Sequence, residues 1–430
     1  SIYMGRTKRA CALVLSALLC VLIGCGQAKE ENVQQKAQPV TYENAMKELQ
    51  QQVTEDTISC WYTSDSDKGY LEDAAAAFEK AYGIKVKLVY YDGVSLFEDM
   101  NQANQQENGP EVYLMGNDQL EYAKTAGVVE QNTVLDDAFW KENYPDTAKK
   151  AMTYKDKQYG YPVYFDTYCL VYDAKLLENA PASIDDILAF LDEYEDTGST
   201  KAVFRWDVAD PYVNSMFLAS YADLFGDNGD DMTSFQVNNE QCVASMQYFQ
   251  SLSAYLWMNK NNISHDTVMN RIKDGTLVLG LCKSDILPTL YEMQSTKTED
   301  SETDYRISYV PSLTAELSST AWSTTYGAFV NSYGKDLAAG NMFAMYLSYA
   351  YQDKQYNANG KLPVKDQGDQ FDDMQKVLYA QYLNSKPVPK VMILGDYLVE
   401  SGIAFDAIWD GKDAQEELDW LQNAMTEKMQ

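Results

Sequence analysis

The sequence predicts an α/β protein of two lobes. Residues 58–62 form an apolar run, residues 71–82 carry apolar side chains at helical spacing, and residues 84–90 alternate apolar side chains with lysine, which is the order of a βαβ unit. The body of the chain has about 375 residues, more than one hydrophobic core usually holds. A long extended run at 161–172 is uncharged except for Asp166 and is long enough to cross between lobes.

The amino-terminal segment indicates export. Three basic residues precede an apolar stretch at 10–24, which is too short to span a membrane comfortably, because a span needs about 20 apolar residues. The stretch ends in Leu22-Ile23-Gly24-Cys25, which resembles the signal of bacterial lipoproteins. We therefore expect 1–24 to be a signal peptide, Cys25 to carry the lipid, and 25–41 to be a flexible tether poor in large apolar residues. An uncleaved anchor is the alternative.

The remaining elements follow in order along the chain. The apolar run at 112–115 predicts a strand, and 120–126 predicts a helix that Gly127 ends. Pro181 and Ser183 begin a helix with an apolar face, which opens the second lobe. Further strands are expected at 276–282, 306–310 and 326–330, and further helices around 243–249, at 336–351 and around 418–425.

Three segments are candidates for crossings between the lobes: the run at 161–172, the strand that leads into Pro311, and Leu362-Pro363-Val364. The expected first lobe therefore combines residues 42–163 and 314–360, and the second lobe combines 164–313 and 361–430.

Composition narrows the possible ligands. The formal net charge is −30, and such a field repels nucleic acid and anionic substrates but leaves neutral or cationic ligands. His265 is the only histidine, and Cys60, Cys169, Cys242 and Cys282 lack CxxC spacing. We expect no metal site, no cofactor and no histidine-dependent catalysis, and we expect these four cysteines to be buried free thiols.

A series of short motifs follows in a characteristic order: Trp61 and Asp67-Lys68-Gly69-Tyr70, Phe78-Glu79-Lys80, Gly83-Ile84-Lys85-Val86, Gly109-Pro110-Glu111, Asp118, Tyr161-Pro162-Val163, Val171-Tyr172-Asp173 and Asp210-Pro211-Tyr212. In the order of these motifs the chain resembles the extracellular solute-binding proteins of ABC importers, in the branch that is maltose-binding-protein-like. The resemblance implies a periplasmic-binding-protein type II fold with three hinge crossings. It also implies a ligand held between two lobes that close on it, and delivery to a membrane permease.

The resemblance also implies the site residues, which are carboxylates that accept sugar hydroxyls, a lysine that donates, and rings that stack on a pyranose. The expected ligand-binding residues are Asp67, Lys68, Asp118, Asp166, Asp210 and Tyr212, with Trp206, Trp322 and Tyr397 as further platforms. Two alternatives stay open. The charged residues at 67, 68 and 118 fit a solvated turn, and the rings fit a hydrophobic core.

One departure affects the ligand. Where maltodextrin-binding members stack sugar on tryptophan, this sequence has Met115, Ser284 and roughly Gly395, so another neutral oligosaccharide fits as well. The expected protein is a monomeric, lipid-anchored, non-enzymatic receptor on the outer face of a bacterial membrane, with an ABC permease as partner. The alternatives are a secreted glycoside hydrolase with paired carboxylates, or a receptor for a non-sugar such as a polyamine.

Overall fold

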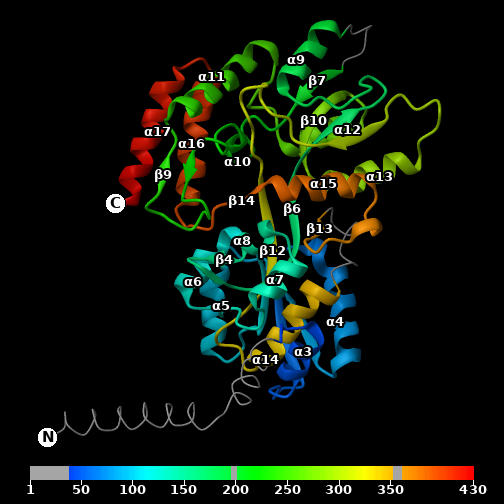
Figure 1. Cartoon of the computed structure of the whole chain (residues 1–430), viewed down its shortest axis with the longest axis vertical. Coiled ribbons are helices and arrows are strands. Elements are labelled where there is room, and N and C mark those ends of the chain that lie inside the picture. The colour runs from blue at the N-terminus through cyan, green and yellow to red at the C-terminus, as the bar shows by residue number, and fades with distance from the viewer. Residues whose placement is uncertain (1–37, 195–200, 352–360) are drawn as a thin grey trace, which may run out of the picture.

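The computed structural model describes residues 38–194, 201–351 and 361–430. The expected signal peptide, Cys25 and most of the expected tether lie outside this part of the chain. The described chain forms two lobes, one below the other in Figure 1, joined through strands that run between them. The predicted two-lobe α/β architecture is therefore confirmed. Within the described ranges, no helix is both long enough and apolar enough to cross a membrane.

The first lobe is the lower one in Figure 1 and is built on the predicted βαβ unit. Strand β1 pairs in parallel with β2 on one side and β3 on the other, and β3 pairs antiparallel with β12. Its elements are α3 (Tyr42–Gln50), β1 (Thr57–Tyr62), α4 (Lys68–Tyr82), β2 (Lys85–Tyr90), α5 (Leu96–Gln105), β3 (Val112–Gly116), α6 (Leu120–Ala126), α7 (Asp137–Asn143), α8 (Asp146–Ala151), β4 (Thr153–Tyr154), β5 (Lys157–Gln158), α14 (Leu337–Met345) and the π-helical turn Tyr346–Ala350.

The second lobe is built around the strands that lie beyond β6 in the ten-stranded sheet. Strand β10 pairs in parallel with β7 and antiparallel with β6, which also pairs with β11. Its elements are α9 (Ile184–Glu193), β7 (Ala202–Arg205), α10 (Pro211–Asn214), β8 (Asp223–Leu224), β9 (Phe235–Gln236), α11 (Glu240–Tyr255), α12 (His265–Lys273), β10 (Leu277–Lys283), α13 (Leu287–Ser295), β11 (Tyr305–Ser308), α15 (Asp373–Asn384), β14 (Lys386–Pro387), α16 (Leu394–Trp409) and α17 (Ala414–Met429).

Three strands connect the lobes. β6 (Tyr161–Asp173) pairs with β12 and β13 through its first half, and with β10 and β11 through its second half. β12 (Trp322–Val330) continues from β6 to β3, and β13 (Leu362–Pro363) pairs with β6. The predicted crossing at 161–172 is this shared strand, and its near-absence of charge follows from burial on both faces.

Helix α15 fixes the middle of β6. The rings of Phe165 and Tyr382 are stacked at a centroid distance of 3.9 Å and an interplanar angle of 7°. The hydroxyl of Tyr382 also shares a 2.7 Å hydrogen bond with Thr325 on β12. One helix thus packs against two crossing strands where they leave the first lobe.

Local signals explain several of the predicted helix ends. Gly83 and Gly127 follow α4 and α6 in the left-handed conformation, each with a φ of 72°, where a residue without Cβ avoids strain. Ser183 caps α9 by accepting a hydrogen bond from the backbone N–H of Asp186. The polar run 63–69 contains a 3₁₀ turn at Asp65–Asp67, which α4 follows directly.

The division of the chain into 42–163 with 314–360 and 164–313 with 361–430 stays a prediction. Leu313, Ala321 and Trp322 still pack in the same hydrophobic cluster as the helices of the second lobe. Ala328, Phe329 and Val330 pack in the other hydrophobic cluster, which contains the core of the first lobe. The second crossing between the lobes is therefore β12 itself. Both ends of this strand are buried, so it carries the chain from one hydrophobic cluster to the other without a loop.

A second contact between the lobes surrounds Lys390, which is fully buried. Its ammonium donates to the carbonyl of Lys150 in α8 at 2.6 Å, its backbone N–H donates to Gly229, and its carbonyl accepts from the backbone of Glu121. The pKa of Lys390 is lowered to about 7, mainly by burial; the charge of Asp230 opposes this shift and that of Lys150 adds to it.

This buried lysine predicts a pH-dependent stability. A lysine in an unfolded chain has a pKa near 10.4, so unfolding takes up a proton between about pH 7 and pH 10. In that window the contribution of Lys390 to the free energy of unfolding should increase with pH, by at most about 1.4 kcal/mol per unit, and it should decrease as the pH falls. Urea unfolding of the wild type and Lys390→Met across this range measures the difference. Parallel curves for the two proteins would contradict the prediction.

Candidate functional site

The carboxyl ends of two neighbouring strands bring the first predicted residues together. β1 and β3 are parallel neighbours, and a 3₁₀ turn follows each, at Asp65–Asp67 and at Asn117–Gln119. Asp67 and Asp118 therefore lie at the same edge of the sheet, which is where open α/β sheets usually bind ligands. Lys68, the first residue of α4, is exposed.

Asp67 is held inside the first lobe. Only 2% of it is exposed, and its Oδ2 accepts a 2.5 Å hydrogen bond from the hydroxyl of Tyr164 on β6. Burial, and then the carboxylate of Asp67, raise the pKa of Tyr164 well above its ordinary value, so this phenol stays a donor. The bond connects the end of β1 to the shared strand.

Asp118 and Asp166 are half-buried acceptors on either side of β12. Gln119 donates to Asp118 Oδ2 at 3.1 Å, and burial raises the pKa of Asp118. Ser284 at the end of β10 donates to Asp166 Oδ1 at 2.7 Å, and Thr324 is the partner of Asp166 across the β6–β12 ladder. A carboxylate from the first lobe and one from the shared strand thus approach the same stretch of β12.

Gly116 makes room for this approach. A Cβ atom at that position would lie 2.6 Å from Asp118 Oδ1, closer than real Cβ atoms come to their neighbours, and 3.0 Å from Thr324 Cγ2, which is a tight contact. Glycine therefore lets the end of β3 lie directly against both side chains.

The second lobe contributes Asp210 and Tyr212. Asp210 is the N-cap of α10, and its Oδ1 accepts from the backbone N–H of Tyr212 at 2.9 Å. The hydroxyl of Tyr212 lies 2.8 Å from Thr324 Oγ1, so the ring reaches across to β12. The ring of Tyr168 lies 6.1 Å away, and that of Trp322 contacts Tyr212 edge-on at 5.3 Å.

The electrostatics show that these groups share one neighbourhood. Burial raises the pKa of Tyr212, and the charges of Asp166, Asp118 and Asp210 raise it further, in that order. The pKa of Tyr326 on β12 is also raised well above normal, by burial and by the charges of Asp166, Tyr212, Asp118 and Asp67. We call Asp67, Asp118, Asp166, Asp210, Tyr212 and Tyr326 the interlobe cluster.

Two lysines lie over the rings of this region. The ammonium of Lys361 is 4.3 Å from the ring centroid of Tyr326, and that of Lys283 is 5.3 Å from the ring centroid of Tyr212. Tyr326, Lys283 and Lys361 were not among the residues predicted from the sequence. Their position in the chain could have indicated them, because each residue belongs to, or directly adjoins, a strand that pairs with β6.

The other three rings that were predicted to stack on a sugar are buried. Trp206 is fully buried and donates its Nε1–H to Asn214 at 2.9 Å, and Tyr397 is fully buried with its hydroxyl 3.0 Å from Ser215. Trp322 is 3% exposed, between the rings of Tyr212 and Tyr397. All three belong to the core of the second lobe, because these large rings fill space behind α10 and α16. We leave Trp206 and Tyr397 out of the proposed site, and Trp322 serves as the support of Tyr212.

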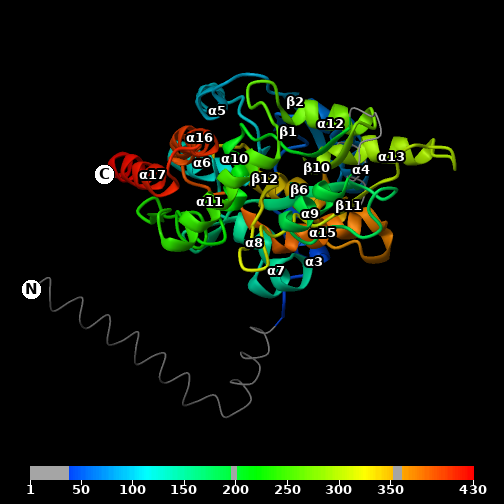
Figure 2. The same ribbon diagram turned by 90° about the horizontal axis from the view of Figure 1, so that it is seen from above.

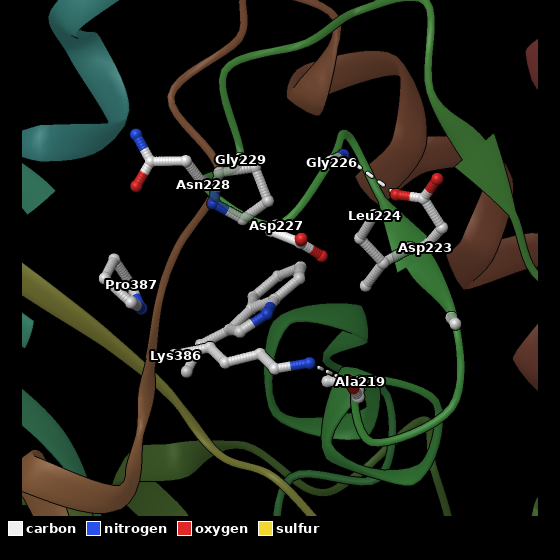
Figure 3. A pocket seen from close by; sticks show the side chains of 12 residues that line it. Ala219, Asp223, Leu224, Gly226, Asp227, Asn228, Gly229, Lys386 and Pro387 are labelled. Atoms are coloured by element: carbon white, nitrogen blue, oxygen red, sulfur yellow. Dashed lines mark hydrogen bonds between the residues drawn. The ribbon is translucent and has the colours of Figure 1, made fainter. Parts of the chain in front are cut away.

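A small pocket of about 150 Å³ also borders Trp322 (Figure 3). The ammonium of Lys386 donates to the carbonyl of Ala219 at 2.6 Å, and Asp223 accepts from the backbone of Gly226 at 2.8 Å, both drawn as dashed lines. Ordinary ligand pockets have about 300–1,000 Å³, so this one is too small for an oligosaccharide.

The described ranges offer few side chains that could bind a metal ion or react as thiols. No group of three or more His, Cys, Asp or Glu side chains in those ranges could hold a metal ion. Cys60, Cys169, Cys242 and Cys282 are free and buried, as expected for structural thiols. His265 lies at the start of α12 and pairs with Asp285 at 2.9 Å.

Comparison with known proteins gives a consistent result. A maltooligosaccharide ABC transporter solute-binding lipoprotein of Streptococcus pneumoniae (strain ATCC BAA-255 / R6) is 23% identical over 371 residues, which cover 82% of this chain and 84% of that protein. An extracellular solute-binding protein from Staphylococcus aureus, solved in complex with maltose, matches with a TM-score of 0.77 at 20% identity, over 87% of this chain and 98% of that one.

A cyclo/maltodextrin-binding protein complexed with maltotetraose matches with a TM-score of 0.76 at 19% identity, over 88% and 98% of the two chains. At these identities the solved structures show the shared fold. The family model that describes bacterial extracellular solute-binding proteins matches residues 73–377, which is most of the chain. The protein therefore belongs to the bacterial extracellular solute-binding proteins.

Proposed function

We propose that this protein binds a neutral oligosaccharide between its lobes and delivers it to the membrane subunits of an ABC transporter. The observation that carries the proposal is the interlobe cluster: the hydroxyl of Tyr212 of the second lobe lies 2.8 Å from Thr324, the ladder partner of Asp166, and the charges of Asp166, Asp118 and Asp210 all raise the pKa of this tyrosine. Carboxylates accept hydroxyl hydrogen bonds strongly, and a tyrosine ring suits the apolar face of a sugar. The relatives named for maltooligosaccharides support the same ligand class.

The proposed mechanism is closure of the lobes around the ligand. A sugar that contacts Asp118 and Asp210 at once interacts fully only when the lobes are together, so its binding energy favours the closed arrangement. The permease would then distinguish loaded from empty protein by the relative position of the lobes. The protein would bind sugar without cleaving it, and transport energy would come from another subunit.

We further propose that lipid on Cys25 anchors the protein to the outer face of the membrane. The lipobox-like tetrad Leu22-Ile23-Gly24-Cys25 supports this, as does the description of a relative as a lipoprotein. Cys25→Ser in the full-length chain should shift the protein from the membrane fraction to the soluble fraction. Retention of the variant in the membrane would argue for an uncleaved anchor instead.

Calorimetric titration with neutral oligosaccharides and with spermidine tests the ligand class. We expect saturable binding of a sugar, no heat from spermidine beyond non-specific charge effects, and an unchanged sugar after prolonged incubation. Preferential binding of spermidine would favour a polyamine receptor. Release of shorter sugars would favour the glycoside hydrolase alternative.

Asp166→Ala should weaken sugar binding by about 1.5–3 kcal/mol, which is more than tenfold in Kd, because it removes a charged acceptor from a half-buried position. Titration of wild type and variant with the same sugar measures the change. Asp369→Ala is the matched control, since that carboxylate is fully exposed. Equal affinities for wild type and Asp166→Ala would exclude Asp166 from the site.

Tyr212→Phe and Tyr212→Ala separate the ring from its hydroxyl. Tyr212→Phe keeps the ring and loses only the bond to Thr324, so sugar affinity should change by less than about threefold. Tyr212→Ala removes the platform and should weaken binding by about tenfold or more. Equal losses in the two variants would assign the effect to the hydroxyl rather than to stacking.

A further inference from the structure

Two cysteines face each other across the ladder between β6 and β10. Cys169 on β6 and Cys282 on β10 are direct partners in this antiparallel pair. In Figure 1 and again in Figure 2, the two strands lie side by side. Directly opposed residues of an antiparallel pair have Cα atoms about 4.5 or about 5.5 Å apart, depending on whether they exchange hydrogen bonds. A disulfide joins residues whose Cα atoms are about 4.4–6.8 Å apart, so either spacing allows one.

Both cysteine side chains point to the same face of the sheet. Cys169 and Cys282 pack in one hydrophobic cluster, together with Ile272 of α12. Their chain neighbours Leu170 and Leu281 pack in the other cluster. This division is expected because successive side chains along a strand point to opposite faces, whereas directly opposed residues share a face. The two thiols are therefore neighbours within one layer of the core.

The other two cysteines of the described ranges have no such arrangement. Cys60 on β1 has Leu88 and Val112 as its ladder partners. Cys242 lies on α11 and belongs to no strand. Opposition across a ladder thus distinguishes Cys169 and Cys282 from both, and it depends on a register that brings together residues far apart in the sequence.

The folded protein protects this pair from oxidants. Cys169 and Cys282 are fully buried, and burial raises the pKa of each thiol. For Cys282 the charge of Cys169 raises the pKa further, which is consistent with their proximity. Because the thiolate is the reactive form, both residues are inert once the lobe has closed around them. Oxidation therefore has to take place while the chain folds, before β10 packs against β6.

We propose that Cys169 and Cys282 form a cross-strand disulfide when the chain folds in the presence of a small disulfide oxidant, RSSR. One thiolate attacks RSSR, which gives a mixed disulfide and releases RS⁻. The second thiolate attacks the protein sulfur of the mixed disulfide, which forms the Sγ–Sγ bond and releases the second RS⁻. The two thiol protons pass to the two RS⁻ groups, so two protein thiols are oxidised and one RSSR is reduced to two RSH.

The disulfide would stabilise the second lobe. It closes a loop that contains α9, α10, α11 and α12, and a cross-link that closes a long loop restricts the unfolded chain. It would also fix the β6–β10 register, which places Ser284 against Asp166 in the interlobe cluster. A location outside the membrane, as proposed for this protein, is one in which disulfides form and persist.

Peptide mapping of the full-length chain in detergent tests the proposal. The chain is unfolded, fully reduced and refolded with either oxidised glutathione or dithiothreitol, after which free thiols are alkylated. Trypsin cuts after lysine and so places Cys169 and Cys282 in separate peptides, 158–175 and 274–283. We expect these peptides to be joined after refolding with oxidised glutathione, and separate and alkylated after refolding with dithiothreitol.

Thermal melting gives a second measurement. The oxidised protein should melt about 5 °C or more above the reduced protein, because the disulfide removes conformations from the unfolded chain. Cys60→Ala/Cys242→Ala is the matched control and should keep both the joined peptides and the shift in Tm. Cys169→Ala should lose both. If Cys169→Ala does not fold, the peptide map of the wild type decides alone.

Two results would overturn the proposal. One is a wild-type chain that melts cooperatively after refolding with oxidised glutathione but has separate, alkylated 158–175 and 274–283 peptides. The other is a folded chain in which Cys169 or Cys282 is joined to Cys60 or Cys242. Neither result depends on sugar binding, so the proposed function is tested separately.

Discussion

The structure depends on one constraint, which is that β6 belongs to both lobes at once. Its first half completes the sheet of the first lobe through β12, and its second half completes the sheet of the second lobe through β10 and β11. The stacked pair Phe165 and Tyr382 supports its middle. Because the strand is continuous, Asp166 near that middle is held by both sheets, and each lobe presents its own polar residues to it.

This constraint also explains the composition of the interlobe cluster. Strand ends from the first lobe supply Asp67 and Asp118, the start of a short helix in the second lobe supplies Asp210 and Tyr212, and β12 supplies Thr324 and Tyr326. Two of the carboxylates are held by separate hydrogen bonds, from Tyr164 to Asp67 and from Ser284 to Asp166. These donors are neutral, so the carboxylates keep their charge and can also accept hydrogen bonds from uncharged hydroxyls.

Much of the fold follows from local sequence patterns. The βαβ unit at 57–90, the strand at 161–173 and the helix cap at Ser183 have short-range signals that tertiary packing does not override. The carboxylates of the cluster were selected through the family resemblance, and only Asp166 also has a signal of its own in the sequence, because it interrupts an apolar run. The aromatic residues other than Tyr212 could not be assigned in this way. Trp206 and Tyr397 have the same side-chain chemistry as a stacking platform, and only long-range packing against Asn214 and Ser215 assigns them to the core. Tyr326 and Lys361 were not predicted because they come close to each other only when β12 and β13 both lie beside β6, which is also a long-range property of the fold.

The bond between Tyr212 and Thr324 has a consequence for the energetics of recognition. The ring is already oriented by its hydroxyl, by Trp322 behind it and by Tyr168 beside it. The side chain therefore loses its rotational freedom during folding and not when a ligand binds. A rigid, pre-oriented surface reduces the entropic penalty of association. Selectivity at this position would then come from how well a partner fits a fixed shape, and poorly matched molecules would gain nothing from local adjustment.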